Sequence, residues 1–234
     1  MPTSIVFTLI FLVFIFLIRR GAYYPPPLLP RRPAREIIEA SLLAGCLLIV
    51  QFIRFDLFWL SGWPSAYLVF GLLAPMVMEW GVRRRGLSDI DFRMPENKKA
   101  LVLVTILFGI YLVARLVIPP LLGAALTFNW QGFLSYSVIF PFVEEVIFRG
   151  MIQTRLEAAW GSVQAWILSG LFFGFHHYYV HFLVIGKPLA VTDVLELVFL
   201  TAFGMLLGVI YAKTRSLLPS YLIHAINNLS LFPM

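Results

Sequence analysis

The chain has 234 residues, of which 60% are hydrophobic and 13% are charged, and its mean hydropathy is +0.88. A soluble domain is nearer half apolar and a quarter charged, so this composition excludes an ordinary soluble protein and indicates a membrane protein. The formal net charge is +6, but the basic residues are not mixed with aromatic residues in polar segments, which argues against nucleic-acid binding. Contact with anionic membrane lipid explains the positive charge better.

The first apolar segment, 3–18, is similar in composition to a secretory signal peptide. It has no basic residue before the apolar run and no small-residue cleavage site after it. Arg19 and Arg20 follow the apolar run instead. We therefore expect a retained first span whose N-terminus lies outside the cell.

Eight apolar segments are long enough, or nearly long enough, to cross a membrane, because a helical span needs about 20 residues. They predict an all-α fold, a polytopic membrane helical bundle of about eight transmembrane helices in a single membrane domain, 1–234. The second segment is the least regular, because Arg54 and Asp56 interrupt it. The predicted spans are 3–18, 37–60, 65–82, 99–118, 133–152, 163–185, 193–212 and 216–232.

The basic residues alternate between the connections of these segments. Of the 18 Lys and Arg residues, 15 lie in every second connection, and the intervening loops hold only Lys187. Basic connections face the cytoplasm in membrane proteins, so this alternation predicts that both termini lie outside. The basic connections are 19–36, 83–99, 149–162 and 213–215.

Two pairs of glycines, Gly170 with Gly174 and Gly204 with Gly208, have the GxxxG spacing. This spacing predicts close packing between helices, and self-dimerisation is the less favoured alternative. Glu79 precedes Arg83 by four residues, which predicts an ordinary ion pair at a helix end.

A charged cluster interrupts the fifth segment, Phe133–Ile152, whose sequence is FLSYSVIFPFVEEVIFRGMI. Ionisable side chains inside a membrane are costly and commonly mark a functional site. Glu145 and Arg149 are four residues apart, so they share a helix face and can pair. Glu144 lies about 100° round the helix. One carboxylate is thus expected to be structural, and Glu144 to be available as a general base.

Polar residues also occur in two later segments. One contains Ser169 and ends in His176 and His177, and the other contains His224 and Asn228. His224 and Asn228 are four residues apart and share a helix face. An asparagine in this position could orient the imidazole, polarise a carbonyl or help to form an oxyanion site.

Three motifs in this order, EExxxR, FxxxH and HxxxN, resemble those of the CAAX prenyl protease and bacteriocin-processing (CPBP, or ABI) family of intramembrane proteases. The resemblance covers about 133–232, which it identifies as a catalytic core, whereas the spans within 1–132 match only in hydrophobicity. Phe172 and His176 also satisfy FxxxH, but the positions of Ser169 and Gly174 favour the later pair. The matching residues are Glu144, Glu145, Arg149, Phe173, His177, His224 and Asn228.

The resemblance implies hydrolysis of a peptide bond in a membrane-associated or lipidated peptide or protein. Glu144 would activate water together with His177, and Glu145 with Arg149 would support it. His224 and Asn228 would stabilise the oxyanion. The resemblance further implies a multi-pass integral protein of the prokaryotic plasma membrane that cleaves near the cytoplasmic side. It does not establish whether the substrate is prenylated.

The resemblance leaves the use of a metal open. The family is often labelled a metalloprotease, and one Glu with two His is a known Zn²⁺ ligand set. If Zn²⁺ is used, His177 and His224 are its expected ligands. A water activated by glutamate without a metal is also chemically sufficient.

Two other functions compete with proteolysis. The chain could be a non-catalytic scaffold or bacteriocin-immunity-type protein of the same fold, because fold does not fix function. It could also be a small transporter with a Glu/His proton relay. The complete set of motif residues favours the enzyme over the scaffold, and their clustering near one side argues against the transporter.

The predicted depths of the motif residues do not agree with one another. At 1.5 Å per residue, Glu144 and His224 lie roughly 10 Å from the cytoplasmic ends of their spans, but His177 lies roughly 20 Å from the start of its span. Either the sixth span begins later than residue 163 or its helix is strongly tilted.

Overall fold

The computed structural model describes most of the chain, and its regular elements there are all helices, which confirms the predicted all-α fold. The irregularity expected at Arg54 and Asp56 lies outside the described residues. The described residues are 2–20, 32–53, 63–82, 84, 91, 93–95, 97–121, 123, 128–180, 186 and 191–229.

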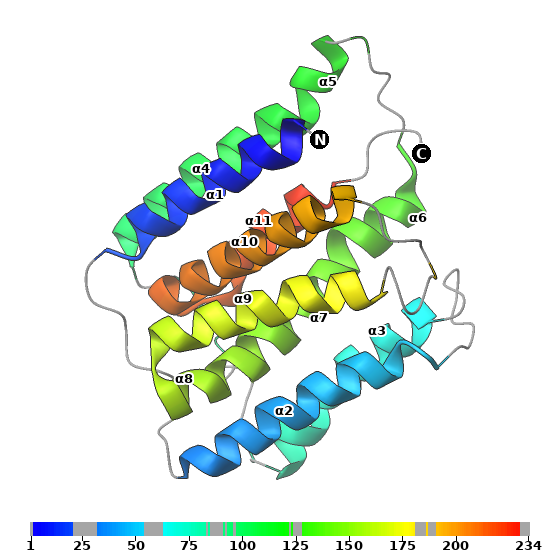
Figure 1. Ribbon diagram of the computed structural model, residues 1–234, viewed down its shortest axis with the longest axis vertical. Helices are drawn as coiled ribbons and strands as arrows, with labels where there is room; N and C mark the ends of the chain where they lie inside the picture. The colour runs from blue at the N-terminus through cyan, green and yellow to red at the C-terminus, as the bar shows by residue number, and fades with distance from the viewer. Residues whose placement is uncertain are drawn as a thin grey trace.

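The helices lie side by side along one common diagonal (Figure 1). Three described stretches, Pro64–Val82, Lys98–Leu116 and Thr192–Thr214, are long and apolar enough to cross a membrane, and Ile5–Ile18 is a shorter apolar helix. Eight spans and the orientation of the termini stay predictions. The α-helices are α1 (Pro2–Ile18), α2 (Pro33–Val50), α3 (Trp63–Pro75), α4 (Lys98–Leu116), α5 (Ile118–Leu121), α6 (Trp130–Gly132), α7 (Phe140–Glu145), α8 (Thr154–Trp160), α9 (Ser162–Tyr179), α10 (Val191–Thr214) and α11 (Leu217–Asn227), and the π-helical stretches are η1 (Met76–Val82), η3 (Phe133–Ile139) and η4 (Val146–Gln153).

A continuous helix runs from Trp130 to Trp160 through α6, η3, α7, η4 and α8. It therefore extends eight residues beyond the predicted end of the fifth span at residue 152. Polar residues led to that early prediction, but Thr154, Arg155 and Glu157 are buried inside the bundle. The helix ends at Gly161, whose φ of +87° is in the left-handed region that favours glycine.

The turn at Gly161 makes α8 and α9 an antiparallel pair, and this geometry removes the disagreement in depth. Glu144 is 16 residues before Trp160, or about 24 Å, and His177 is 15 residues after Ser162, or about 22 Å. The two side chains are therefore level. Helix α9 begins at Ser162, and where the sixth span enters the membrane stays a prediction.

His224 reaches the same level by a different route. It is only seven residues from the start of α11 at Leu217. The preceding residues, Thr214, Arg215 and Ser216, have no exposed surface. The connection between α10 and α11 thus lies inside the bundle. Helix α11 therefore starts deeper in the bundle than α9, which starts at the turn at Gly161.

Helices α9 and α10 pack closely through the two glycine pairs, as their spacing predicts. A Cβ atom added to Gly170 would lie 2.6 Å from the backbone nitrogen of Met205, and one added to Gly204 would lie 2.9 Å from the Cβ atom of Phe173 on α9. Real Cβ atoms do not approach so closely, so larger residues would force the two helices apart.

The N-terminal helices are interleaved with the C-terminal ones: α1 packs on α10, α2 on α8, and α4 on α11. One of their contacts is ionic. Arg155 on α8 is fully buried and contacts Glu39 of α2 at 3.0 Å and Glu79 of η1 at 2.6 Å. The partner predicted for Glu79, Arg83, lies outside the described residues, and its observed partner is 76 residues away in the chain.

The basic ends of the helices gather at one end of the bundle. The end of α1, the starts of α2 and α4, α8 and the end of α10 all lie at the left of Figure 1. Polar contacts join them, for example Lys213 Nζ to the carbonyl of Arg20 at 3.3 Å and Arg93 Nε to the carbonyl of Arg215 at 3.0 Å. This arrangement agrees with the predicted alternation, whereas which end faces the cytoplasm stays a prediction.

Candidate active site

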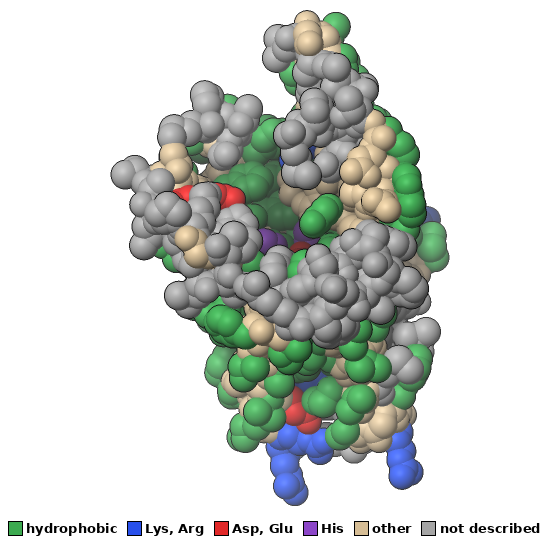
Figure 2. Space-filling view, turned by 90° about the vertical axis from the view of Figure 1, so that its right-hand side faces the viewer, with side chains coloured by type: hydrophobic (Ala, Val, Ile, Leu, Met, Phe, Trp, Pro, Cys, Tyr) green, Lys and Arg blue, Asp and Glu red, His purple; other side chains and the backbone are tan. Residues whose placement is uncertain are grey.

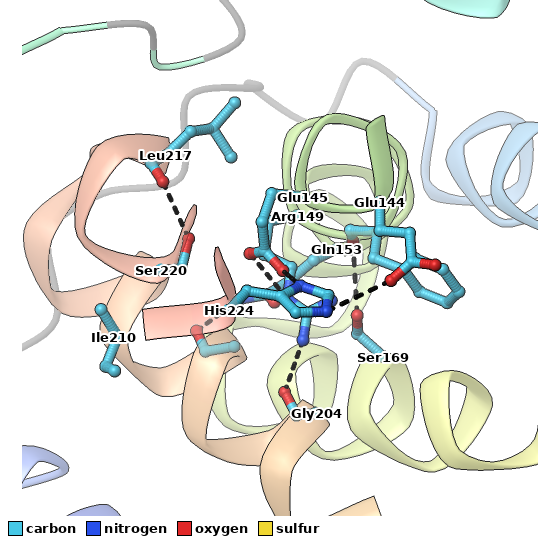
Figure 3. A network of polar contacts seen from close by, with 12 residues as sticks. Glu144, Glu145, Arg149, Gln153, Ser169, Gly204, Ile210, Leu217, Ser220 and His224 are labelled. Atoms are coloured by element: carbon cyan, nitrogen blue, oxygen red, sulfur yellow. Dashed lines mark hydrogen bonds and ion pairs between the residues drawn. The ribbon is translucent and has the colours of Figure 1, made fainter. Parts of the chain in front are cut away.

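Five of the six predicted site residues meet in the middle of the bundle, from three separate helices. Glu144 and Glu145 end α7 and Arg149 follows one turn later in η4, while α9 supplies His177 and α11 supplies His224. Glu145, Arg149 and His224 have at most 1% of their surface exposed, and Glu144 has 8%. Figure 3 shows Glu144, Glu145, Arg149 and His224 pointing toward one another.

The predicted pair of Glu145 and Arg149 is present, with Arg149 Nε 3.4 Å from Glu145 Oε2. Arg149 Nη2 also donates to the carbonyl of Gly204 at 2.9 Å (Figure 3), and the guanidinium lies 4.8 Å from the centre of the Phe173 ring. A buried charge is costly unless it is paired and hydrogen-bonded. The close packing at Gly204 therefore has a second effect, because it brings a backbone carbonyl within reach of Arg149.

His224 bridges the two carboxylates. Its Nδ1 is 2.9 Å from Glu145 Oε1, and its Nε2 is 3.3 Å from Glu144 Oε2 (Figure 3). The Nδ1 contact is a hydrogen bond, and the Nε2 contact is a close polar approach to Glu144. Arg149 and His224 thus lie against the two carboxylates inside the bundle.

His177 is held from the other side of Glu144. Its Nδ1 lies 2.9 Å from the carbonyl of Phe173, one turn earlier, which fixes the ring with Nε2 toward Glu144. The distance from Nε2 to Glu144 Oε2 is 3.8 Å, too long for a direct hydrogen bond. The His177 side chain is 25% exposed, against 10% for Glu144 and 2% for His224. It is thus the member of the group that water can reach most easily.

The structure separates the two adjacent histidines. His176 is 3% exposed, and its ring stacks on Tyr67 at 5.7 Å and meets the edge of Phe148 at 5.6 Å. These are packing contacts on a neighbouring face of α9. His177 is the residue that faces Glu144, as the spacing to Ser169 and Gly174 favours.

Asn228 lies at the end of α11, away from this group. Its backbone N–H donates to the carbonyl of His224, and its own carbonyl accepts from Ser137 Oγ at 2.9 Å. Its side-chain oxygen accepts from the Asn227 amide at 3.0 Å. Among the described residues its amide makes no contact with the carboxylates, so an oxyanion site shared by His224 and Asn228 stays a prediction.

Residues 126–230 match the family of type II CAAX prenyl endopeptidase Rce1-like proteins. This segment contains all six predicted site residues, and the five that converge do so from its helices. It is an Rce1-like domain. The resemblance predicted from the three motifs is thereby confirmed, and this family supports a CAAX-type intramembrane protease at family level. The apolar helices agree with an integral membrane protein. No curated protein and no solved structure matches the chain.

Two polar contacts of the Rce1-like domain extend the site along the helix. Gln153 Nε2 donates to the carbonyl of Gly208 at 2.9 Å, which repeats the contact from Arg149 to Gly204 one turn later. The recurrence of polar residues at 145, 149, 153 and 157 is the sequence signal that would have revealed this row.

Tyr67 is the other residue that sequence reasoning missed. It lies on α3, outside the Rce1-like domain, and is 1% exposed. Its side chain interacts with the carboxylate of Glu144. Nothing in the spacing of the sequence identifies it, because its partner is 77 positions away.

The expected Zn²⁺ ligands do not form a metal site with the residues around them. Among the described residues, no group of three His, Cys, Asp or Glu side chains has an arrangement that could hold a metal ion. Both ring nitrogens of His224 already face carboxylate oxygens. His181, four residues after His177, lies outside the described residues. We therefore derive no chemical step through a metal.

Two openings border the Rce1-like domain. A cavity of about 370 Å³ lies between α7, η4 and α11, with Glu145 in its wall, and its other lining residues are Arg93, Met94, Phe142, Val146, Leu217, Leu218 and Tyr221. Figure 2 looks onto the opposite end of the bundle from the basic residues, where α9 ends and α10 begins, and histidine side chains are visible in a hollow there.

Proposed function

We propose that this protein is an endopeptidase that hydrolyses a peptide bond of a membrane-associated or lipidated peptide by a water activated between Glu144 and His177. One observation carries the proposal. Glu144 Oε2 lies 3.3 Å from the buried His224 Nε2 and 3.8 Å from the partly exposed His177 Nε2. The carboxylate thus contacts a buried imidazole on one side and faces a solvent-accessible imidazole on the other.

A single water fits this geometry. Two groups 3.8 Å apart can both lie at hydrogen-bond distance, about 2.8 Å, from one water oxygen. Because His177 Nδ1–H is directed to the carbonyl of Phe173, its Nε2 is left as an acceptor. The water would then donate one hydrogen to His177 and the other to Glu144, and its lone pair would be free to attack.

In the proposed reaction, Glu144 removes a proton as the water oxygen attacks the peptide carbonyl carbon. The carbonyl oxygen becomes an oxyanion, which an N–H of His224 stabilises in this proposal. Glu144 then returns the proton to the amide nitrogen as the C–N bond breaks, which releases an amine and a carboxylic acid, and the acid loses its remaining proton to the amine or to solvent. Glu145 and Arg149 hold His224 in place and do not react.

The cavity beside Glu145 supports an apolar substrate. Its wall contains Phe142, Val146, Leu217 and Leu218, and its volume of about 370 Å³ lies within the range of small-molecule binding sites. We propose that it receives the apolar part of the substrate next to the cleaved bond. Whether that part is a prenyl group or apolar side chains is decided by comparing matched peptides with and without a prenyl cysteine.

The test is cleavage by the purified protein in detergent, with an internally quenched prenylated peptide and its unprenylated counterpart as probes. Glu144→Gln keeps the size of the side chain but removes the base, so we expect cleavage to fall by at least about 10³-fold. Glu196→Gln on α10 is the matched control and should cleave at the wild-type rate. Full activity of the Glu144→Gln variant would refute the proposal.

The same variant distinguishes a scaffold from an enzyme in cells. A scaffold or immunity-type protein would keep its biological effect when Glu144 is replaced by Gln, because the fold is unchanged. The proposal instead requires that new protein N-termini found in wild-type cells disappear in cells with Glu144→Gln.

A further inference from the structure

Tyr67 is held beside the site by two stacked ring contacts. The ring stacks on Phe140 at 6.0 Å and on His176 at 5.7 Å, with interplanar angles of 29° and 25°. Phe140 lies one helical turn before Glu144, and His176 is adjacent to His177. The same two helices that carry the proposed base and its partner histidine therefore fix the position of the tyrosine.

A close approach of α3 to α7 brings Tyr67 into this position. A Cβ atom added to Gly71, one turn after Tyr67, would overlap the side chain of Val143, the residue before Glu144. The absence of a side chain at Gly71 thus lets the two helices touch at this level. With 1% of its surface exposed, Tyr67 is screened from solvent.

The polar end of Tyr67 meets the proposed base. The hydroxyl and the Glu144 carboxylate interact electrostatically, although no direct hydrogen bond joins them in this structure, and Glu145 and Arg149 act on the hydroxyl more weakly. A buried tyrosine hydroxyl usually needs a hydrogen-bond partner, and an ionised carboxylate is a strong acceptor. A hydrogen bond from the hydroxyl would therefore hold the carboxylate from a third direction, in addition to those of His224 and His177.

We propose that Tyr67 is a positioning residue of the peptidase, supplied by the N-terminal helices, whose hydroxyl donates to Glu144 and fixes the carboxylate toward the water site. This inference rests on the proposed function. Tyr67 touches the base and not the substrate, so its loss should lower kcat and leave KM unchanged. A hydrogen bond to a charged group corresponds to an effect of about 10- to 100-fold.

The first experiment compares Tyr67→Phe with Tyr111→Phe, using the quenched prenylated peptide in detergent. Tyr111 is an equally buried tyrosine on α4 that stacks on Phe7 and Phe11, remote from Glu144. We expect kcat to fall 10- to 100-fold for Tyr67→Phe at constant KM, and no change for Tyr111→Phe. A wild-type kcat for Tyr67→Phe, or a loss that appears only in KM, overturns the inference.

A second variant covers the case in which Tyr67→Phe does not fold. 3,5-Difluorotyrosine at position 67 keeps the ring and the hydroxyl and changes only the strength of the donor. We expect it to change kcat, while the same replacement at position 111 has no effect. An unchanged kcat at position 67 overturns the inference.

Glu144→Gln separates this inference from the proposed function. If Glu144→Gln is inactive and Tyr67→Phe is fully active, only the role of Tyr67 is wrong. If Glu144→Gln is active, the proposed function fails and the role of Tyr67 fails with it.

Discussion

The N-terminal helices and the Rce1-like domain differ in where they place their polar side chains. The Rce1-like domain buries a row of ionic groups along one helix and surrounds it with closely packed glycines. The N-terminal helices α1 and α4 instead expose large apolar side chains such as Leu9, Val13, Val102 and Ile106. Even so, three side chains of the N-terminal part interact with buried residues of the Rce1-like domain. They are Glu39, Glu79 and Tyr67. Family motifs therefore locate the chemistry of this protein, and residues outside the motifs stabilise it.

The largest effect expected concerns the two adjacent histidines. His177→Ala removes the group that faces Glu144, and we expect a loss of about 10²- to 10⁴-fold in kcat. His176→Phe preserves the ring contacts with Tyr67 and Phe148 and should retain most of the activity. Peptide cleavage assays of both variants check this, and equal losses would show that the site does not distinguish the two faces of α9.

The next effect measures how far the N-terminal helices stabilise the Rce1-like domain. Arg155→Met leaves Glu39 and Glu79 without their buried cation, which should cost about 3–5 kcal/mol of unfolding free energy. The control is Arg35→Met, because Arg35 also pairs with Glu39 but its side chain is 56% exposed. We expect less than about 1 kcal/mol for the control. Denaturant unfolding in detergent measures the unfolding free energy of both variants. Equal losses would show that burial does not determine how much each ion pair stabilises the protein.

A smaller effect contrasts the glycines of the two parts. In Gly204→Ala the new methyl group would lie 2.9 Å from Phe173 Cβ and 3.0 Å from Gly170, so overpacking should cost about 1–3 kcal/mol. Gly45→Ala on α2 has no heavy atom within 4 Å of the new methyl group and should be neutral or stabilising by up to about 1 kcal/mol. Thermal unfolding of both variants tests the contrast, which fails if Gly204→Ala is tolerated as well.

The smallest effect concerns the cavity beside Glu145. Leu218→Trp would occupy part of it, so KM for the quenched peptide should rise several-fold, by about 1 kcal/mol, while kcat is unchanged. Leu112→Trp on α4 changes a similarly exposed leucine of the N-terminal part and should alter neither constant. An unchanged KM for Leu218→Trp would remove the cavity from the proposed substrate path.

Local spacing in the sequence predicted the parts of the site that lie on single helices. The four-residue separation of Glu145 and Arg149 predicted their ion pair, and the GxxxG pairs predicted the close approach of α9 and α10. Both predictions succeed because the pitch of a helix places residues that are four positions apart on the same face. The continuation of the long helix beyond the predicted span could not be foreseen, because burial of Arg155 and Glu157 depends on Glu39, Glu79 and Arg215, which belong to other elements.

By itself the sequence thus determined the helical membrane fold, the family of residues 126–230 and the identities of the residues that converge. Only the tertiary structure decided which groups meet: His224 between the two carboxylates, His177 rather than His176 at Glu144, and Tyr67 beside them. The physical reason is that a short-range rule fixes the face of a helix, whereas the rotation and height of one helix against another depend on packing along their whole lengths. The glycines at 71, 170 and 204 and the turn at Gly161 set those heights here.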